Sequence, residues 1–147
     1  MNQSQQMIQK KYEGELIMNH ASVLREEIAV LKAKLPKENP GHFVHGMTVE
    51  SAVALLDANC ITDAVEHLER MQEAYGGCSS TKERELYEEA TELLNAIKAA
   101  YNVPEHTWGW SQARGHYDSY KTWEEEYVAK INKEIATKET LLEILLK

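Results

Sequence analysis

The chain has few of the residues that mark disulfide-built or membrane-built proteins. Its 147 residues include two cysteines, three prolines, seven glycines and one phenylalanine. Two cysteines do not make a disulfide framework, and no apolar stretch approaches the roughly 20 residues of a membrane span. The opening residues also lack the apolar run of a signal peptide. The sequence therefore predicts a cytoplasmic protein with no membrane partner.

The two cysteines cannot reach each other in the predicted structure. Cys60 and Cys78 flank an expected helix of about 13 residues, which holds them roughly 20 Å apart at 1.5 Å per residue. A disulfide needs Cα atoms within about 7 Å, so two free thiols in a reducing compartment are expected. Neither thiol has an identifiable base and oxyanion arrangement in the sequence. No catalytic residue is assigned.

The sequence also lacks alternating runs rich in Val, Ile and Thr, so no sheet is expected. Apolar residues recur at helical spacing instead. We expect an all-α protein, a single helical bundle of about five helices over residues 1–147, with long N- and C-terminal helices and three shorter central ones. Residues 1–14 are expected to fray, and 36–47 and 102–116 to be irregular connectors.

The first helix carries two apolar stripes. Its strongest part, residues 15–35, ends before Pro36 and has one stripe formed by Ile17, Leu24, Ile28, Leu31 and Leu35. A second stripe lies about 120° around the helix and consists of Tyr12, Leu16, Val23 and Val30. A helix with two apolar sides packs against two neighbours, which together with the long last helix predicts a homo-oligomer.

Hydroxyl and glycine residues predict the ends of the central helices. Three expected N-caps are Thr48, Thr62 and Ser80, the last within a capping box that includes Glu83. Expected helix ends lie near Asn59, Gly76 and Asn102. The final helix is expected from about Tyr117, and Lys138 interrupts its apolar stripe, which argues against a closed coiled-coil seam throughout.

Charge is unevenly distributed along the chain. The formal net charge is −8, and residues 63–101 carry most of it. Because a basic footprint for phosphate is missing, direct nucleic-acid binding is not expected. An acidic face can meet a basic partner or mimic nucleic acid, although its commoner meaning is solubility.

Histidines do not form a recognisable metal motif. Among the six histidines, His42 and His45 are the only close pair. Structural zinc needs four ligands at workable spacing, and no CxxC or HExxH accompanies this pair. No metal and no cofactor are therefore predicted.

One acidic motif resembles that of an enzyme family. Glu88, Glu89 and Glu92 match the EExxE pattern with which MazG-like nucleotide pyrophosphohydrolases, also all-helical, hold magnesium. The resemblance implies metal-dependent hydrolysis of a nucleotide. The second acidic pair of that family, ExxD, is absent here, and the helical wheel turns Glu88 and Glu92 away from the apolar stripe.

Aromatic residues concentrate between 108 and 127. All three tryptophans lie there, and the candidate binding residues are Trp108, Trp110, Arg114, His116, Tyr117 and Tyr120. Trp, Tyr and Arg dominate binding hot spots. The competing interpretation is a packed plug over the end of the bundle, and the helical spacing of Tyr120, Trp123 and Tyr127 favours a place in the core.

These features favour a non-enzymatic interaction protein that binds a partner protein and oligomerises. We expect an acidic helical regulator or inhibitor, a class that includes phage-type proteins. The alternative is a small-molecule binder in which the aromatic and Arg segment holds a nucleotide-like anionic ligand. A MazG-like pyrophosphohydrolase is the third hypothesis.

Overall fold

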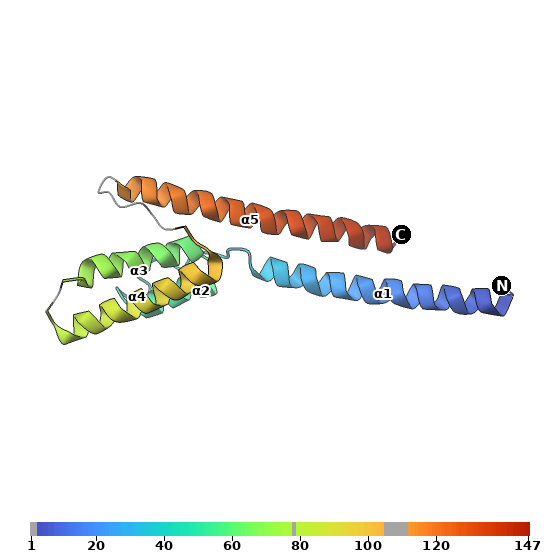
Figure 1. Cartoon of the computed structure of the whole chain (residues 1–147), viewed down its shortest axis with the longest axis horizontal. Coiled ribbons are helices and arrows are strands. Elements are labelled where there is room, and N and C mark those ends of the chain that lie inside the picture. The colour runs from blue at the N-terminus through green and yellow to red at the C-terminus, as the bar shows by residue number, and fades with distance from the viewer. Residues whose placement is uncertain (1–2, 78, 105–111) are drawn as a thin grey trace. The chain divides into compact units, whose positions relative to one another are not determined.

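The computed structural model describes residues 3–77, 79–104 and 112–147, and for residues 3–12 and 112–119 it describes the backbone alone. Its helices are α1 Gln3–Ala33, α2 Val49–Asp57, α3 Ile61–Tyr75, α4 Thr81–Tyr101 and α5 Gln112–Leu145 (Figure 1). Within these ranges no strand occurs. The prediction of an all-α protein with long end helices and three shorter central ones is confirmed. Both end helices begin earlier than the apolar periodicity alone indicated.

The contacts divide the chain into two compact units. Unit 1 consists of Met1–Leu35 and Val128–Lys147, and unit 2 of Pro36–Tyr127. Helix α5 contributes its first part to unit 2 and its second part to unit 1.

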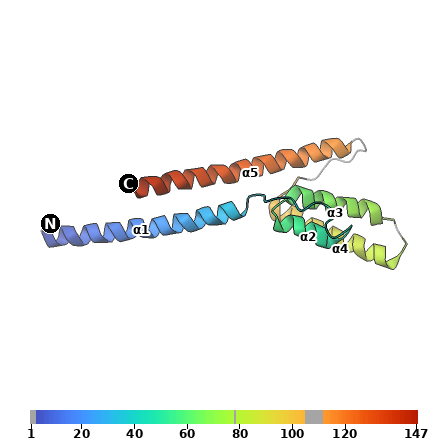
Figure 2. The ribbon, with the colours of Figure 1, turned by 180° about the vertical axis from the view of Figure 1, so that it is seen from behind.

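Unit 1 is an antiparallel pair of helices. Figures 1 and 2 show α1 beside the second part of α5, with the N-terminal end of α1 running past the C-terminus. The predicted α1 stripe supplies buried Leu24, Ile28 and Leu31, and α5 supplies buried Ile131 and Ile135. The interruption of the α5 stripe is explained by an ion pair, because Lys138 Nζ lies 2.7 Å from Glu27 Oε2 on α1. A second pair joins Lys32 to Glu139 at 3.2 Å.

Unit 2 is built around α3. Helices α2 and α3 form a hairpin, and α4 packs against both. Seven of the 15 residues of α3 are buried. Its apolar members pack with residues of α2 and α4 in one core, which includes Leu55, Leu68, Met71, Leu94 and Ile97. Tyr120 of α5 is also fully buried in this core.

The predicted helix ends agree with the structure. Asn59 follows α2 with φ 59° and Asn102 follows α4 with φ 54°, so each takes the left-handed conformation that ends a helix. Gly76 is the C-cap of α3, and Gly77 has φ 88°. Asn tolerates this conformation better than other non-glycine residues because its short side chain bonds locally.

One of the three predicted N-caps is wrong, and the other two are at the predicted positions but make no capping hydrogen bond. Cys60, not Thr62, is the N-cap of α3, and Thr62 lies inside the first turn with its hydroxyl directed to a carboxylate of α5. Ser80 is at the N-cap of α4 as expected, but its side chain makes no capping hydrogen bond. The same holds for Thr48 on α2, whose hydroxyl donates instead to the carbonyl of His45 at 2.8 Å.

The central place of α3 makes a stability prediction. Replacing Leu68 by Ala removes a fully buried side chain and should lower the free energy of unfolding of unit 2 by about 2–5 kcal/mol. Urea unfolding followed by tryptophan fluorescence tests this, since all three tryptophans lie in residues 36–127. Val53→Ala, at an exposed apolar residue of α2, is the control and should cost less than about 1 kcal/mol.

Candidate functional site

Carboxylates gather along the edge of the unit 2 core. Asp63, Glu66 and Glu69 are spaced by three on α3, which puts them on one face of that helix. All three lie between the buried positions of the same helix and solvent, and each is half-buried. Glu124, half-buried on α5, lies next to them. We call Asp63, Glu66, Glu69 and Glu124 the carboxylate cluster.

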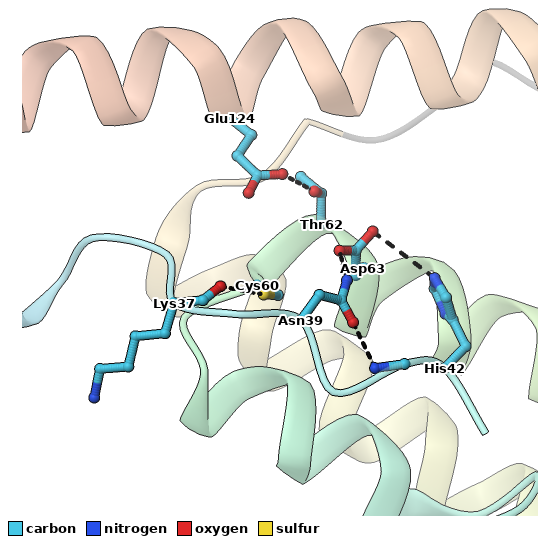
Figure 3. A network of polar contacts seen from close by, with 8 residues as sticks. Lys37, Asn39, His42, Cys60, Thr62, Asp63 and Glu124 are labelled. Atoms are coloured by element: carbon cyan, nitrogen blue, oxygen red, sulfur yellow. Dashed lines mark hydrogen bonds and ion pairs between the residues drawn. The ribbon is translucent and has the colours of Figure 1, made fainter. Parts of the chain in front are cut away.

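Two hydroxyl groups attach α5 to α3 through this cluster. The hydroxyl of Thr62 donates to Oε2 of Glu124 (Figure 3). Two turns further along α3 and one turn earlier along α5, the phenol of Tyr120 donates to Oε1 of Glu69. The two bonds have opposite order along α3 and α5, so the helices run antiparallel here. Each bond satisfies one oxygen of a carboxylate whose burial would otherwise cost more.

The connector before α2 closes the cluster from another side. The side-chain amide of Asn39 donates to Oδ2 of Asp63, and the backbone N–H of Gly41 holds the amide oxygen of Asn39 at 2.7 Å (Figure 3). The N–H of Lys37 donates to the carbonyl of Ala58 at 2.7 Å. Residues 36–47 are irregular, as predicted from their prolines and glycines, but these hydrogen bonds fix part of them against α2 and α3.

The cluster is electrostatically strained. Burial first, and Asp63 second, raise the pKa of Glu66 to about 7, although Arg70 acts in the opposite direction. Burial also raises the pKa of Glu69, against the effect of its hydrogen bond from Tyr120. Glu124 has a raised pKa for the same first reason, and Asp63 and Glu125 add to it. A positive charge placed among these carboxylates would reduce the repulsion between them and would lower their pKa values.

Two histidines next to the cluster are held in the neutral form. Burial lowers the pKa of both His42 and His67 below the ordinary value of 6.5. His67 is fully buried on α3, and its Nε2 donates to the carbonyl of Thr48 at 2.9 Å. The ring of His42 stacks on that of His67, with 6.1 Å between centroids. Nε2 of His42 lies 3.8 Å from Oδ1 of Asp63, too far for a hydrogen bond.

His42, Asp63 and Glu66 are the residues here that could hold a metal ion. One ligand atom from each lies within 4.8 Å of the others. The 3.8 Å between His42 and Asp63 fits two bonds of roughly 2.1 Å to a shared cation at an open angle. His45, the expected neighbour of His42, does not belong to this group within the described residues. Structural zinc sites use four protein ligands, and this group offers three.

Cys60 lies beside the cluster as a buried free thiol. Burial first, then the charges of Asp63 and Glu124, raise the pKa of this thiol. A raised pKa favours the thiol over the nucleophilic thiolate at neutral pH. The side chain therefore acts here as part of the core.

The aromatic candidate site falls mostly outside the described side chains. Trp108 and Trp110 lie outside the described residues, and the side chains of Arg114, His116 and Tyr117 lie outside those described on α5. Tyr120 is fully buried and positions Glu69. Trp123 and Tyr127 are half-buried and stack at 5.2 Å between ring centroids. The core position expected from the spacing of these three residues is thus found for Tyr120.

The EExxE motif lies on the surface of α4. Glu88, Glu89 and Glu92 are all exposed, while Ala90, Leu94 and Ile97 are buried on the other side of the helix. The expected direction of Glu88 and Glu92, away from the apolar stripe, is confirmed. Three exposed carboxylates of this kind are an ordinary solvated helix face.

Comparison of the chain with known proteins identified no relative. No protein-family model, no curated protein and no solved structure matches the chain. No helix among the described residues has both the length and the apolar character needed to cross a membrane. The carboxylate cluster thus has to be interpreted from its own chemistry.

Sequence reasoning missed this cluster. The acidic face of α3 was visible as charge, but nothing in the sequence placed Glu124 or His42 against it. The only available signal was weak: Asn39 and His42 lie in a connector rich in turn residues, and Thr62 follows a helix start that it does not cap.

The pKa of Glu66 predicts how stability depends on pH. A raised pKa means that the folded chain holds the Glu66 proton more tightly than the unfolded chain. Its stabilising contribution is therefore complete below about pH 4.5 and is lost as pH rises to about 7. Glu66→Gln should stabilise unit 2 by roughly 1 kcal/mol at pH 8, after allowance for solvent screening, and have little effect at pH 4.5.

Urea unfolding of Glu66→Gln at both pH values measures this difference. Glu92→Gln, which removes the same charge from the exposed face of α4, should change stability little at either pH. A Glu66→Gln protein that is less stable than wild type at pH 8 would show that the carboxylate is stabilised by the fold.

Proposed function

We propose that the chain is a non-enzymatic interaction protein in which unit 2 binds a basic segment of a partner protein. The distribution of charge supports this. Residues 36–127 contain 17 acidic and seven basic side chains, a formal net charge of −10. The remainder of the chain, unit 1, has seven acidic and nine basic side chains and a net charge of +2. The net negative charge of the chain therefore lies entirely in unit 2.

The observation that carries the proposal is the strain within the carboxylate cluster. Glu66, Glu69 and Glu124 are kept half-buried at raised pKa values instead of being turned into solvent. Partly desolvated carboxylates bind a cationic group more strongly than exposed ones do, because the local dielectric constant is lower. A hydrogen bond to a charged group contributes about 1.5–3 kcal/mol.

Lys and Arg side chains fit this cluster. A guanidinium group presents several donors in a plane and can bridge two carboxylates, and an ammonium group can enter between them. Binding of either favours the ionised form of Glu66, so the protein releases a proton on binding when the pH is near or below 7. Affinity should therefore rise with pH through this range and fall with salt.

Such a surface fits a regulator or inhibitor. A partner whose working surface is basic would have that surface covered by an acidic helical face, in the way that nucleic acid would cover it. The rival hypothesis, a small anionic ligand at the aromatic and Arg segment, concerns residues 108–117, whose side chains lie outside the described ones.

Binding of a basic peptide tests the proposal. A fluorescein-labelled ten-residue peptide of Lys, Arg and Gly should bind at pH 8 and low salt, with binding followed by anisotropy. Glu66→Gln should weaken binding about tenfold, the equivalent of one charged hydrogen bond. Glu92→Gln makes the same change of net charge on the exposed face of α4 and should weaken binding less than about twofold.

Two results would change the interpretation. Equal weakening by Glu66→Gln and Glu92→Gln would mean that only net charge attracts the peptide. Stoichiometric binding of Zn²⁺ or Mn²⁺ in calorimetry, lost in His42→Ala, would identify a metal ion as the occupant of the His42, Asp63 and Glu66 group. The peptide proposal would then fail.

A further inference from the structure

An apolar stripe on α1 is left exposed by the described part of the chain. The side chains of Leu16, Val23 and Val30 are 58%, 50% and 58% exposed. They repeat every seven residues. Each immediately precedes a residue of the α1 stripe that faces α5, which we call the seam: Ile17, Leu24 or Leu31. A seven-residue repeat keeps a stripe on one side of a supercoiled helix over its whole length.

Helix α5 carries the matching edge. Leu141 and Ile144, 46% and 60% exposed, immediately precede Leu142 and Leu145, which are half-buried. In an antiparallel pair of right-handed helices, the residues that precede seam residues on both helices point to the same side of the pair. The ion pair of Glu27 with Lys138 sets Val23 beside the turn of α5 that holds Leu141. Unit 1 therefore has one apolar face that is two helices wide.

We propose that a second copy of this chain covers this face, with α1 antiparallel to α1 of the other copy and Val23 at the two-fold axis. The stripe is symmetric about that residue, since Leu16 and Val30 are each seven residues away. The antiparallel arrangement therefore places Leu16 of each copy against Val30 of the other. Two such helix pairs packed face to face form a four-helix bundle.

Charge favours the same register. With Val23 at the axis, Glu13 lies level with Ala33 of the second copy, one position before Lys34. The antiparallel arrangement therefore brings Glu13 of each copy near Lys34 of the other, which gives one pair of opposite charges at each end of the apolar stripe. Unit 1 as a whole is close to neutral, with a net charge of +2, whereas unit 2 carries −10. Two copies can meet through unit 1 without the repulsion that two acidic units would exert.

The projecting end of α1 gives a further reason for a second copy. Figures 1 and 2 show this end beyond the C-terminus of α5, so α5 of the same chain does not cover it. In the proposed register, the turn around Leu16 lies over the C-terminal half of α1 of the other copy. The interface lies in unit 1 and is independent of the basic-peptide site in unit 2.

The mass in solution tests this proposal. Static light scattering should give about 34 kDa, twice the 16.8 kDa of one chain. Val23→Glu places two carboxylates at the two-fold axis and should weaken the dimer at least tenfold, giving a monomer at low micromolar concentration. Val53→Glu introduces the same charge at an exposed apolar residue of α2 in unit 2 and should remain dimeric. Circular dichroism should show both variants to be helical.

Crosslinking tests the register without relying on a disruptive variant. In a background of Cys60→Ala and Cys78→Ala, Val23→Cys should oxidise to a disulfide-linked dimer, because residue 23 meets its own copy. Ala29→Cys, exposed on another side of α1, should crosslink at least tenfold more slowly. A monomeric wild-type protein, or a dimer that Val23→Glu leaves unchanged and Val23→Cys does not link, would overturn the proposal.

Discussion

The apolar packing of α3 at the centre of unit 2 is the constraint that holds its carboxylates partly buried. This helix is packed against α2 and α4 and is joined to α5 by hydrogen bonds. Seven of its residues are buried, and the acidic residues alternate with them along the same helix. Water is therefore excluded from one side of each carboxylate, and burial is the first cause of the raised pKa of Glu66, Glu69 and Glu124. The hydroxyls of Thr62 and Tyr120 offset part of this cost.

The two units differ in charge and in exposed apolar surface. Unit 2 concentrates negative charge on a compact core, whereas unit 1 is a nearly neutral pair of helices with an uncovered apolar face. A highly charged body resists self-association, and a neutral apolar face promotes it. This division is consistent with one unit that meets a cationic partner and another that meets its own copy.

The sequence predicts the helices well and their polar contacts poorly. Apolar spacing located α2, α3 and α4, and Asn59, Gly76 and Asn102 marked helix ends, because these depend on residues near in sequence. The prediction that Thr62 is a cap is wrong because its hydroxyl has two possible partners. As a cap its oxygen would accept from a nearby backbone N–H, whereas in the structure the hydroxyl donates to Glu124, 62 positions later. The possible metal-ligand group of His42, Asp63 and Glu66 likewise depends on how residues 36–47 fold back onto α3. No local sequence pattern encodes that fold.

The pKa of the Glu66 carboxyl group is the most direct measure of this account, because both the strain in the cluster and its attraction for a cation depend on it. Carbon-detected NMR titration of the glutamate carboxyl groups, with Glu66 assigned by comparison with Glu66→Gln, gives that value in the intact chain. The account predicts a pKa of about 7. A value near the ordinary 4.5 would show that the carboxylate is well solvated and would contradict the account.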